Sequence, residues 1–491
     1  MENSKNWRKR EVLTDKKCCR YLAALLIIPV FISCSTPWIR ANPPSLQQHG
    51  TDTTTAAPSP ASVDSVKEIN FADAFDASIS LPDEIAESDS IPGSAITTAS
   101  RRSEPFSVPT NRVRVALVQN TGRLVVYSVG AVRLHTARQP YSDGYRGRML
   151  IEARKGNRIR LTAGFRPVEA ALPCTLLSDQ AYNFIEIGDN TYRGALIVTS
   201  GKPGTFTAVN YLEVEEYLRG VVPLELGRHS PEEIEALKAQ AVAARTYTYR
   251  RIIERKEQPF DLVATVADQV YGGVDVEYRE ADKAIKATRN TILTYGDSII
   301  LAYYHSTCGG TTSDVHQVWR KPAEPYLRSV SDLDGSGKAW CRASAYFTWE
   351  ESWPWKQFSA IVVSNLQRQF SKHFKGVVNS ISVDDRFPCG RVSRLTITGS
   401  GWAQECGGDQ VRFIIRRGIA GHPILRSANF SVVPSGRSVI KITGKGYGHG
   451  VGMCQMGAIG RAQAGQDFQT ILQAYYSGVT FSVISAGADA R

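Results

Sequence analysis

The chain has 491 residues, a composition ordinary for a globular protein and a formal net charge of +11. This length allows two or three domains, and the charge is uneven, with +4 on residues 1–34, −6 on residues 35–110 and therefore +13 on residues 111–491. A basic folded region favours an anionic polymer as partner. We expect no nucleic-acid partner, because the sequence has no zinc-finger spacing, no aromatic RNA-binding motif and no basic heptad region.

Residues 1–34 are typical of an export signal. A positively charged segment precedes an apolar run from Tyr21 to Ile32, which is too short to span a bilayer comfortably. The run ends at Phe31-Ile32-Ser33-Cys34, which resembles a bacterial lipobox with Cys34 as the lipidated residue. An uncleaved signal anchor is the alternative. Both interpretations predict a membrane-anchored protein of the cell envelope, with most of the chain outside the cytoplasm.

The remaining residues divide into three parts. Residues 35–110 are rich in Ser, Thr, Pro, Ala and Asp without sustained periodicity, which predicts a disordered linker. Residues 111–215 alternate apolar and polar side chains between short turns, which predicts antiparallel strands. Residues 216–485 add helices and further strands, and we expect them to form the catalytic core. The expected class is α+β, with an antiparallel β-rich core and a long central helix that carries the active-site region.

The nine cysteines are too sparse for a disulfide scaffold, and no pair has the CxxC spacing. Cys389 and Cys406 flank a predicted hairpin. They could pair in an oxidising compartment or remain as two buried thiols.

Residues 216–251 predict an apolar strand or turn that leads Glu225 into the start of a helix. Ser230 to Glu233 have the pattern of a helix start, with Ser at the N-cap, Pro next and Glu three residues after the cap. Lys238 and Arg245 are two turns apart and share a face of this helix. Four residues recur at helical spacing and are expected in the core: Leu237, Ala241, Ala244 and Thr248.

These residues also carry a resemblance to a known family. GVVPLE, ending at Glu225, followed by EALKAQAVAARTY resembles the signature of the SpoIID/LytB domain family. The resemblance continues downstream, and five blocks in the same order over more than half of the chain make it specific. The four further blocks are VADQVYGG (Val266–Gly273), AYYHSTCGG (Ala302–Gly310), PYLRSVSD (Pro325–Asp332) and GYGHGVGMCQMGA (Gly446–Ala458).

The resemblance implies a lytic transglycosylase that cleaves the MurNAc–GlcNAc bond of peptidoglycan without water. Hydrolysis of a glycoside usually needs two carboxylates, whereas this reaction can use Glu225 alone, first as acid and then as base. Glu225 then needs a raised pKa. Lys238 and Arg245 would oppose this shift, whereas four flanking apolar residues would favour it by desolvation: Val221, Val222, Leu224 and Leu226.

The matching blocks also predict the residues that hold the glycan strand. Five glycines from Gly444 to Gly452 alternate with side chains, so that an extended strand would offer a bare face to a sugar ring. A purely structural glycine strand is the alternative. The predicted glycan-binding residues are Lys238, Gln240, Arg245, Asp268, Gln269, Tyr271, His305, Ser306, Tyr447, His449 and Gln455.

A Cys–His nucleophilic pair at His305 and Cys308 is conceivable, but residues three apart at a strand end point to opposite faces. We therefore expect these residues to position substrate. Zinc bound through His305 or His316 with Cys308 and Cys341 is a further alternative. We expect no metal and no other cofactor.

A second function comes from the same family. LytB-type members enhance a separate amidase, so the protein could be a wall-binding modulator with a cell-wall amidase as partner and no turnover of its own. Glu225 within a full set of matching blocks favours the enzyme.

Overall fold

A computed structural model describes residues 106–137, 140–178, 180, 183–415, 424–434 and 438–486. The export signal, Cys34 and the linker up to residue 105 lie outside the described residues. The described part mixes helices with several sheets and is rich in strands, as the sequence predicts. No helix in these ranges is both long enough and apolar enough to cross a membrane.

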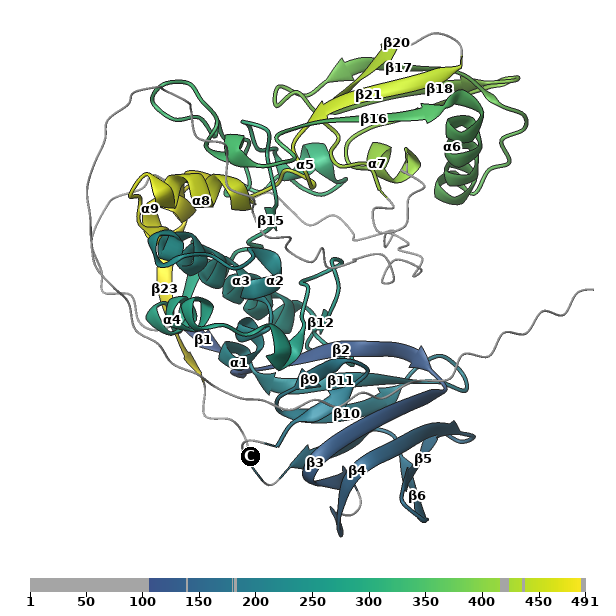
Figure 1. Cartoon of the computed structure of the whole chain (residues 1–491), viewed down its shortest axis with the longest axis vertical. Helices are drawn as coiled ribbons and strands as arrows, with labels where there is room; N and C mark the ends of the chain where they lie inside the picture. Colours follow the sequence, from purple (N-terminus) through teal and green to yellow (C-terminus); the bar gives the residue numbers. More distant parts are fainter. Residues whose placement is uncertain are drawn as a thin grey trace, which may run out of the picture. The chain divides into compact units, whose positions relative to one another are not determined.

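The first part is an 11-stranded sheet, visible at the bottom of Figure 1. Its main path runs β12-β2-β11-β10-β7-β3-β4-β5-β6, with β8 paired to β3 and β9 paired to β8. Neighbouring strands are antiparallel except β12 and β2, so the antiparallel strands predicted for residues 111–215 are confirmed. The strands are β2 (Arg112–Thr121), β3 (Arg123–Thr136), β4 (Pro140–Arg154), β5 (Arg158–Ala163), β6 (Arg166–Ala171), β7 (Cys174–Ser178), β8 (Ile185–Ile187), β9 (Asn190–Tyr192), β10 (Ala195–Ser200), β11 (Phe206–Glu213) and β12 (Leu262–Val263).

A four-stranded sheet joins the two ends of the described chain. Strand β1 (Phe106–Val108) pairs in parallel with β23 (Thr480–Ala486), which pairs with β13 (Thr291–Tyr295). Strand β14 (Ser298–Ile299) completes the sheet. Residues 106–108 belong to the segment predicted as linker, so the linker assignment extends too far toward the C-terminus. A local pattern cannot show a strand whose partner lies at the other end of the chain.

The long helix α3 (Ile234–Glu254) is the centre of the helical part (Figure 1). Ser230 and Glu233 form the predicted capping box, and a 3-10 turn, η2 (Pro231–Glu233), leads into α3. The residues predicted for its core face are buried. Around it lie α1 (Val214–Arg219), α2 (Val222–Glu225), α4 (Arg279–Ala287), α8 (Gln455–Gln463) and α9 (Phe468–Tyr475), with the short helices η3 (Gly273–Val276), α5 (Val315–Val318) and η4 (Trp340–Ala343) in the connecting loops.

Residues 348–445, called the inserted lobe below, form a second hydrophobic core within the region predicted as one catalytic part. The lobe begins and ends in one antiparallel pair, with Thr348 opposite Lys445. Cys389 and Cys406 are free and buried, which is the second of the two predicted alternatives. Its elements are β16 (Thr348–Pro354), α6 (Trp355–Phe370), β17 (Val378–Arg386), β18 (Val392–Gly399), β19 (Trp402–Cys406), α7 (Gln410–Ile414), β20 (Phe430–Pro434) and β21 (Val439–Lys445).

Candidate active site

Glu225 is the last residue of α2 and therefore precedes the long helix rather than lying on it. Its Oε1 accepts the backbone N–H of Val270 at 2.7 Å, and Tyr304 and Gln455 also form hydrogen bonds with the carboxylate. Protein atoms surround the group, yet part of the residue's surface remains accessible. Burial raises the pKa of Glu225 to about 7, and the three hydrogen bonds only partly offset this effect.

Two short parallel strands bring the partners of Glu225 together. In β15 (Tyr304–His305) and β22 (Met453–Cys454), Tyr304 lies opposite Met453. Gln455 follows β22 directly and opens α8. Its Nε2 donates to Oε1 of Gln240 on α3 at 3.3 Å. The structure thus places Gln240 and Gln455, both predicted site residues, beside each other, and Gln455 contacts Glu225.

Tyr304 is a site residue that the sequence-based prediction missed. It directly precedes His305 in the predicted block AYYHSTCGG, so its position in that block was the available signal. Its hydroxyl accepts a hydrogen bond from Nε2 of Gln269 at 3.0 Å. Gln269 is fully buried and also accepts from Tyr217 and Thr248. Gln269 therefore positions Tyr304 and, through it, Glu225, instead of facing the solvent where a glycan would bind.

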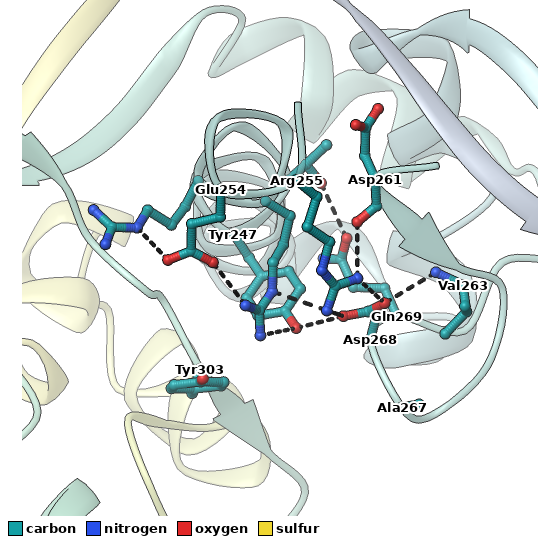
Figure 2. A network of polar contacts seen from close by, with 12 residues as sticks. Tyr247, Glu254, Arg255, Asp261, Val263, Ala267, Asp268, Gln269 and Tyr303 are labelled. Atoms are coloured by element: carbon teal, nitrogen blue, oxygen red, sulfur yellow. Dashed lines mark hydrogen bonds and ion pairs between the residues drawn. The ribbon is translucent and has the colours of Figure 1, made fainter. Parts of the chain in front are cut away.

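Asp268 joins the end of α3 to the loop that follows it (Figure 2). Its carboxylate accepts from Tyr247 Oη at 2.9 Å, Arg255 Nη1 at 2.8 Å and the backbone N–H of Val263 at 3.0 Å. The side chain is only 3% exposed. Protein donors occupy this carboxylate, so the structure gives Asp268 a structural role in place of the predicted contact with glycan.

Three further predicted glycan-binding residues also have partners within the protein. Arg245 is 0% exposed and its Nε lies 2.7 Å from Glu215 Oε1. Tyr271 is buried and donates to Asn210 Oδ1 at 2.9 Å. Lys238 Nζ lies 2.6 Å from a carboxylate in the preceding turn. The predicted glycan contact through Arg245 and Tyr271 is therefore replaced by core packing, because a fully buried side chain cannot reach a polymer.

These pairings also decide what sets the pKa of Glu225. We expected Lys238 and Arg245 to lower it, but the groups that lower it are Val270, Gln455 and Tyr304. The expected cationic effect is wrong because each cation has its own carboxylate partner. The flanking apolar residues act as expected, since Val221, Val222 and Leu226 are buried.

His305 and His449 lie close together, with ring centroids 5.5 Å apart. His305 Nδ1 is 3.2 Å from Val451 O, and His449 packs on Trp319 at 4.9 Å. Burial lowers the pKa of His449 to about 4 and holds the pKa of His305 well below its usual value. Both rings are neutral at pH 7. Neither ring therefore supplies a positive charge near neutral pH.

Ser306 and Tyr447 lie beside this pair in the chain, and both are more exposed than the buried His305. Ser306 Oγ is 3.2 Å from the hydroxyl of Thr307. The Tyr447 ring packs against Tyr346 with centroids 4.8 Å apart. Both side chains are half-buried. They remain candidates for contact with a glycan strand.

The glycine block is not the extended strand that we expected. Strand β21 ends at Lys445, and the next four alternating glycines all have positive φ, from +70° to +106°. A Cβ at Gly452 would lie 2.0 Å from Tyr303 O, and one at Gly450 would lie 2.3 Å from Arg391 Cζ. The glycines therefore allow close packing of this loop against its neighbours. Their role is structural, as in the alternative, but they lie in a loop and not in a strand.

The two chemical alternatives at His305 and Cys308 do not form as the sequence indicated. His305 contacts Val451, whereas the Cys308 thiol lies 3.2 Å from Asp332 Oδ2 and 3.5 Å from Cys341 Sγ. A Cys–His pair is therefore absent between these two residues. The predicted zinc ligands are only partly brought together. Cys308 and Cys341 lie close to each other, but neither predicted histidine, His305 nor His316, belongs to their group.

The arrangement around Glu225 can transfer one proton in both directions. With a pKa of about 7, the carboxyl is protonated and ionised in similar amounts near neutral pH. The groups that shift its pKa are a backbone amide, a glutamine and a tyrosine, none of which is a second carboxylate. Such a site suits general acid–base catalysis by a single group.

The region around Glu225 is also similar in sequence to known proteins. A family model described as stage II sporulation protein matches residues 202–295, which include Glu225, and a domain of unknown function matches residues 338–452. An uncharacterized protein of Brachyspira hyodysenteriae is 33% identical over 56% of this chain and 68% of its own length. Stage II sporulation protein D of Bacillus amyloliquefaciens is 31% identical over 56% of this chain and 76% of its own length. The amidase enhancer of Bacillus subtilis is 30% identical over 54% of this chain, which spans only 40% of that relative.

Proposed function

Because this chain belongs to the SpoIID family of stage II sporulation proteins, we propose that it acts on the bacterial cell wall as a lytic transglycosylase. Its substrate is the glycan strand of peptidoglycan. The reaction cleaves the β-1,4 bond between MurNAc and GlcNAc and leaves a 1,6-anhydro end. The basic charge of residues 111–491 favours association with an anionic wall polymer.

The observation that supports this proposal is the raised pKa of the enclosed Glu225 carboxyl. The protonated carboxyl donates its proton to the glycosidic oxygen while the bond from that oxygen to C1 breaks. The resulting carboxylate then accepts the proton of the MurNAc 6-hydroxyl as its oxygen bonds to C1. The carboxyl is regenerated in its starting form, and no water is consumed.

The neighbours of Glu225 suit both halves of this cycle. The Val270 N–H, Tyr304 and Gln455 stabilise the ionised carboxylate after the first proton transfer, whereas burial favours the protonated acid before it. Because these contacts fix the orientation of the carboxylate, the same oxygen can serve in both steps.

The test uses Glu225→Gln, which keeps the shape and the hydrogen-bond acceptor but cannot exchange the catalytic proton. Purified glycan strands are digested and 1,6-anhydro ends are counted by mass spectrometry. We expect at least about a hundredfold loss of product. Glu257→Gln, which removes an exposed carboxylate, is the matched control and keeps wild-type turnover. Wild-type turnover by Glu225→Gln would refute the single-carboxylate mechanism.

Similarity to an amidase enhancer favours a second candidate function, in which the chain stimulates a wall amidase without cleaving glycan. Glu225→Gln separates the two functions. If the wild-type protein releases no anhydro ends and both proteins stimulate an amidase equally on isolated cell walls, the enhancer function holds.

We also propose that the protein is anchored at the membrane through its N-terminal segment, with Cys34 as the lipidated residue. This proposal rests on the sequence of residues 1–34. If residues 35–110 form the linker that the sequence predicts, a flexible chain of about seventy residues has a root-mean-square reach of roughly 45–50 Å. An enzyme tethered in this way can act within the cell wall while its anchor stays in the membrane.

A further inference from the structure

Three buried cysteines and one buried aspartate lie close together, next to the β15–β22 strand pair that carries Tyr304. Cys308, Cys341, Cys454 and Asp332 each offer one ligand atom, and these four atoms lie within 4.8 Å of one another. All four residues are fully buried. They come from separate segments of the chain, among them the short helix η4 with Cys341 and the strand β22 with Cys454, and the first and last lie 146 positions apart. Such a convergence of thiols is not needed to fill a core, because small apolar residues would do so without polar groups.

Backbone donors point at the sulfur atoms of this cluster. The N–H of Cys308 lies 3.1 Å from Cys454 Sγ, and the N–H of Gly457 lies 3.3 Å from the same atom. The N–H of Gly310 lies 3.2 Å from Cys308 Sγ. Cys454 is also the N-cap of helix α8, where the aligned peptide dipoles favour negative charge. The sulfur atoms of Cys308 and Cys454 therefore accept hydrogen bonds from backbone N–H groups, as metal-bound thiolates do.

Hydrogen bonds also fix the orientation of the Asp332 carboxylate. Its Oδ1 accepts from Tyr475 Oη at 2.8 Å and from Arg461 Nη2 at 3.1 Å. Its Oδ2 faces the Cys308 thiol at 3.2 Å. A carboxylate ligand is commonly oriented by hydrogen bonds to its second oxygen. A Cβ on Gly457 would lie 2.4 Å from Oδ2, so this position leaves room for the carboxylate only as glycine.

We propose that Cys308, Cys341, Cys454 and Asp332 bind one structural zinc ion. Zinc–sulfur bonds of about 2.3 Å in a tetrahedron place sulfur atoms about 3.8 Å apart, and the sulfurs of Cys308 and Cys341 are 3.5 Å apart already. Four protein ligands close the coordination sphere, as in structural rather than catalytic zinc sites. Thiolates select zinc over magnesium or calcium. Binding releases the thiol protons to solvent.

This site replaces the sequence-based expectation of no metal and differs from the ligand sets considered there. His305 is not among the four residues whose ligand atoms lie close together. Cys454 and Asp332 take the third and fourth positions. The buried negative charge is further offset by Arg461 beside Asp332.

The zinc ion would hold the strands that carry the active site. Cys454 lies opposite His305 in the β15–β22 pair and directly precedes Gln455. His305 in turn directly follows Tyr304. Tyr304 and Gln455 are the side chains that contact Glu225. The four ligands are therefore positioning residues, and loss of the ion would disturb the geometry of Glu225 without removing a reacting group.

The test measures zinc in the full-length protein, purified in zinc-containing buffer and dialysed against metal-free buffer. Inductively coupled plasma mass spectrometry is expected to give about one zinc ion per chain. Cys454→Ser is expected to lose most of this zinc. Cys406→Ser and Cys174→Ser, which change buried thiols outside the cluster, keep it. Circular dichroism shows whether each variant is folded.

A second measurement on the wild-type protein keeps the test valid if Cys454→Ser does not fold. Replacement of zinc by Co²⁺ is expected to give the near-ultraviolet absorption of thiolate bound to cobalt. Less than about a tenth of one zinc per chain, with no cobalt–thiolate absorption, would overturn the proposal. So would a Cys308–Cys341 disulfide found by mass spectrometry under non-reducing conditions, or full zinc content in folded Cys454→Ser.

Discussion

Glu225→Gln should stabilise the folded protein while it lowers product formation at least about a hundredfold. The pKa of Glu225 rises from 4.5 to about 7 on folding, and each pKa unit corresponds to about 1.4 kcal/mol. Because the folded pKa is raised, the favourable contribution of the protonated group is present below pH 4.5 and is lost as pH rises through 7. Glutamine does not titrate, so it avoids this loss.

The gain from Glu225→Gln therefore depends on pH. We expect it to be under about 1 kcal/mol at pH 5 and roughly 3 kcal/mol at pH 8. Urea denaturation of both proteins at the two pH values gives the difference directly. Glu257→Gln, whose side chain is 88% exposed, controls for the loss of a carboxylate. An equal effect of Glu225→Gln at pH 5 and pH 8 would refute the raised pKa on which the acid–base cycle depends.

Three further predictions concern other parts of the molecule. Tyr304→Phe removes a hydrogen bond that lowers the pKa of Glu225, so the alkaline limb of the pH–rate profile should move to higher pH; an unchanged limb would contradict this contact. Glu215→Gln leaves the buried Arg245 without its charged partner, and the free energy of unfolding should fall by about 3–5 kcal/mol; a loss below about 1 kcal/mol in denaturation would show that the pair is not needed. Cys34→Ser should release the protein into the soluble fraction or block processing of its precursor, and a processed, membrane-bound variant would rule out lipidation.

The sequence predicts features whose causes are local. The capping box at Ser230 and Glu233, the buried face of α3 and the antiparallel strands of residues 111–215 all follow from short-range patterns. These features are predictable because a helix cap and the alternation of apolar and polar side chains in a strand both depend on residues close together in the chain. The burial around Glu225 was also predictable, since apolar residues flank it in the chain.

Long-range partners explain what the sequence did not predict. From the sequence alone, Asp268 and Arg245 are plausible surface-binding residues. In the structure, Asp268 is paired with Arg255 and Arg245 with Glu215. The sequence likewise places Gly450 in an extended strand with an open glycine face. In the structure, Arg391 from the middle of the inserted lobe occupies the space beside Gly450. A pattern of residue types carries no information on which distant group will satisfy a polar side chain.

The strand pair that closes the inserted lobe has a consequence for how such proteins diversify. Because Thr348 and Lys445 lie opposite each other, the chain leaves and re-enters the SpoIID core at a single point. A segment of almost any length can be exchanged there without changing the path of the core, since closing a longer loop costs little additional entropy. Arg391 limits that freedom, as its guanidinium donates to the carbonyls of Cys308 and Thr311 in the core. A replacement segment would have to supply an equivalent donor or leave those carbonyls unsatisfied.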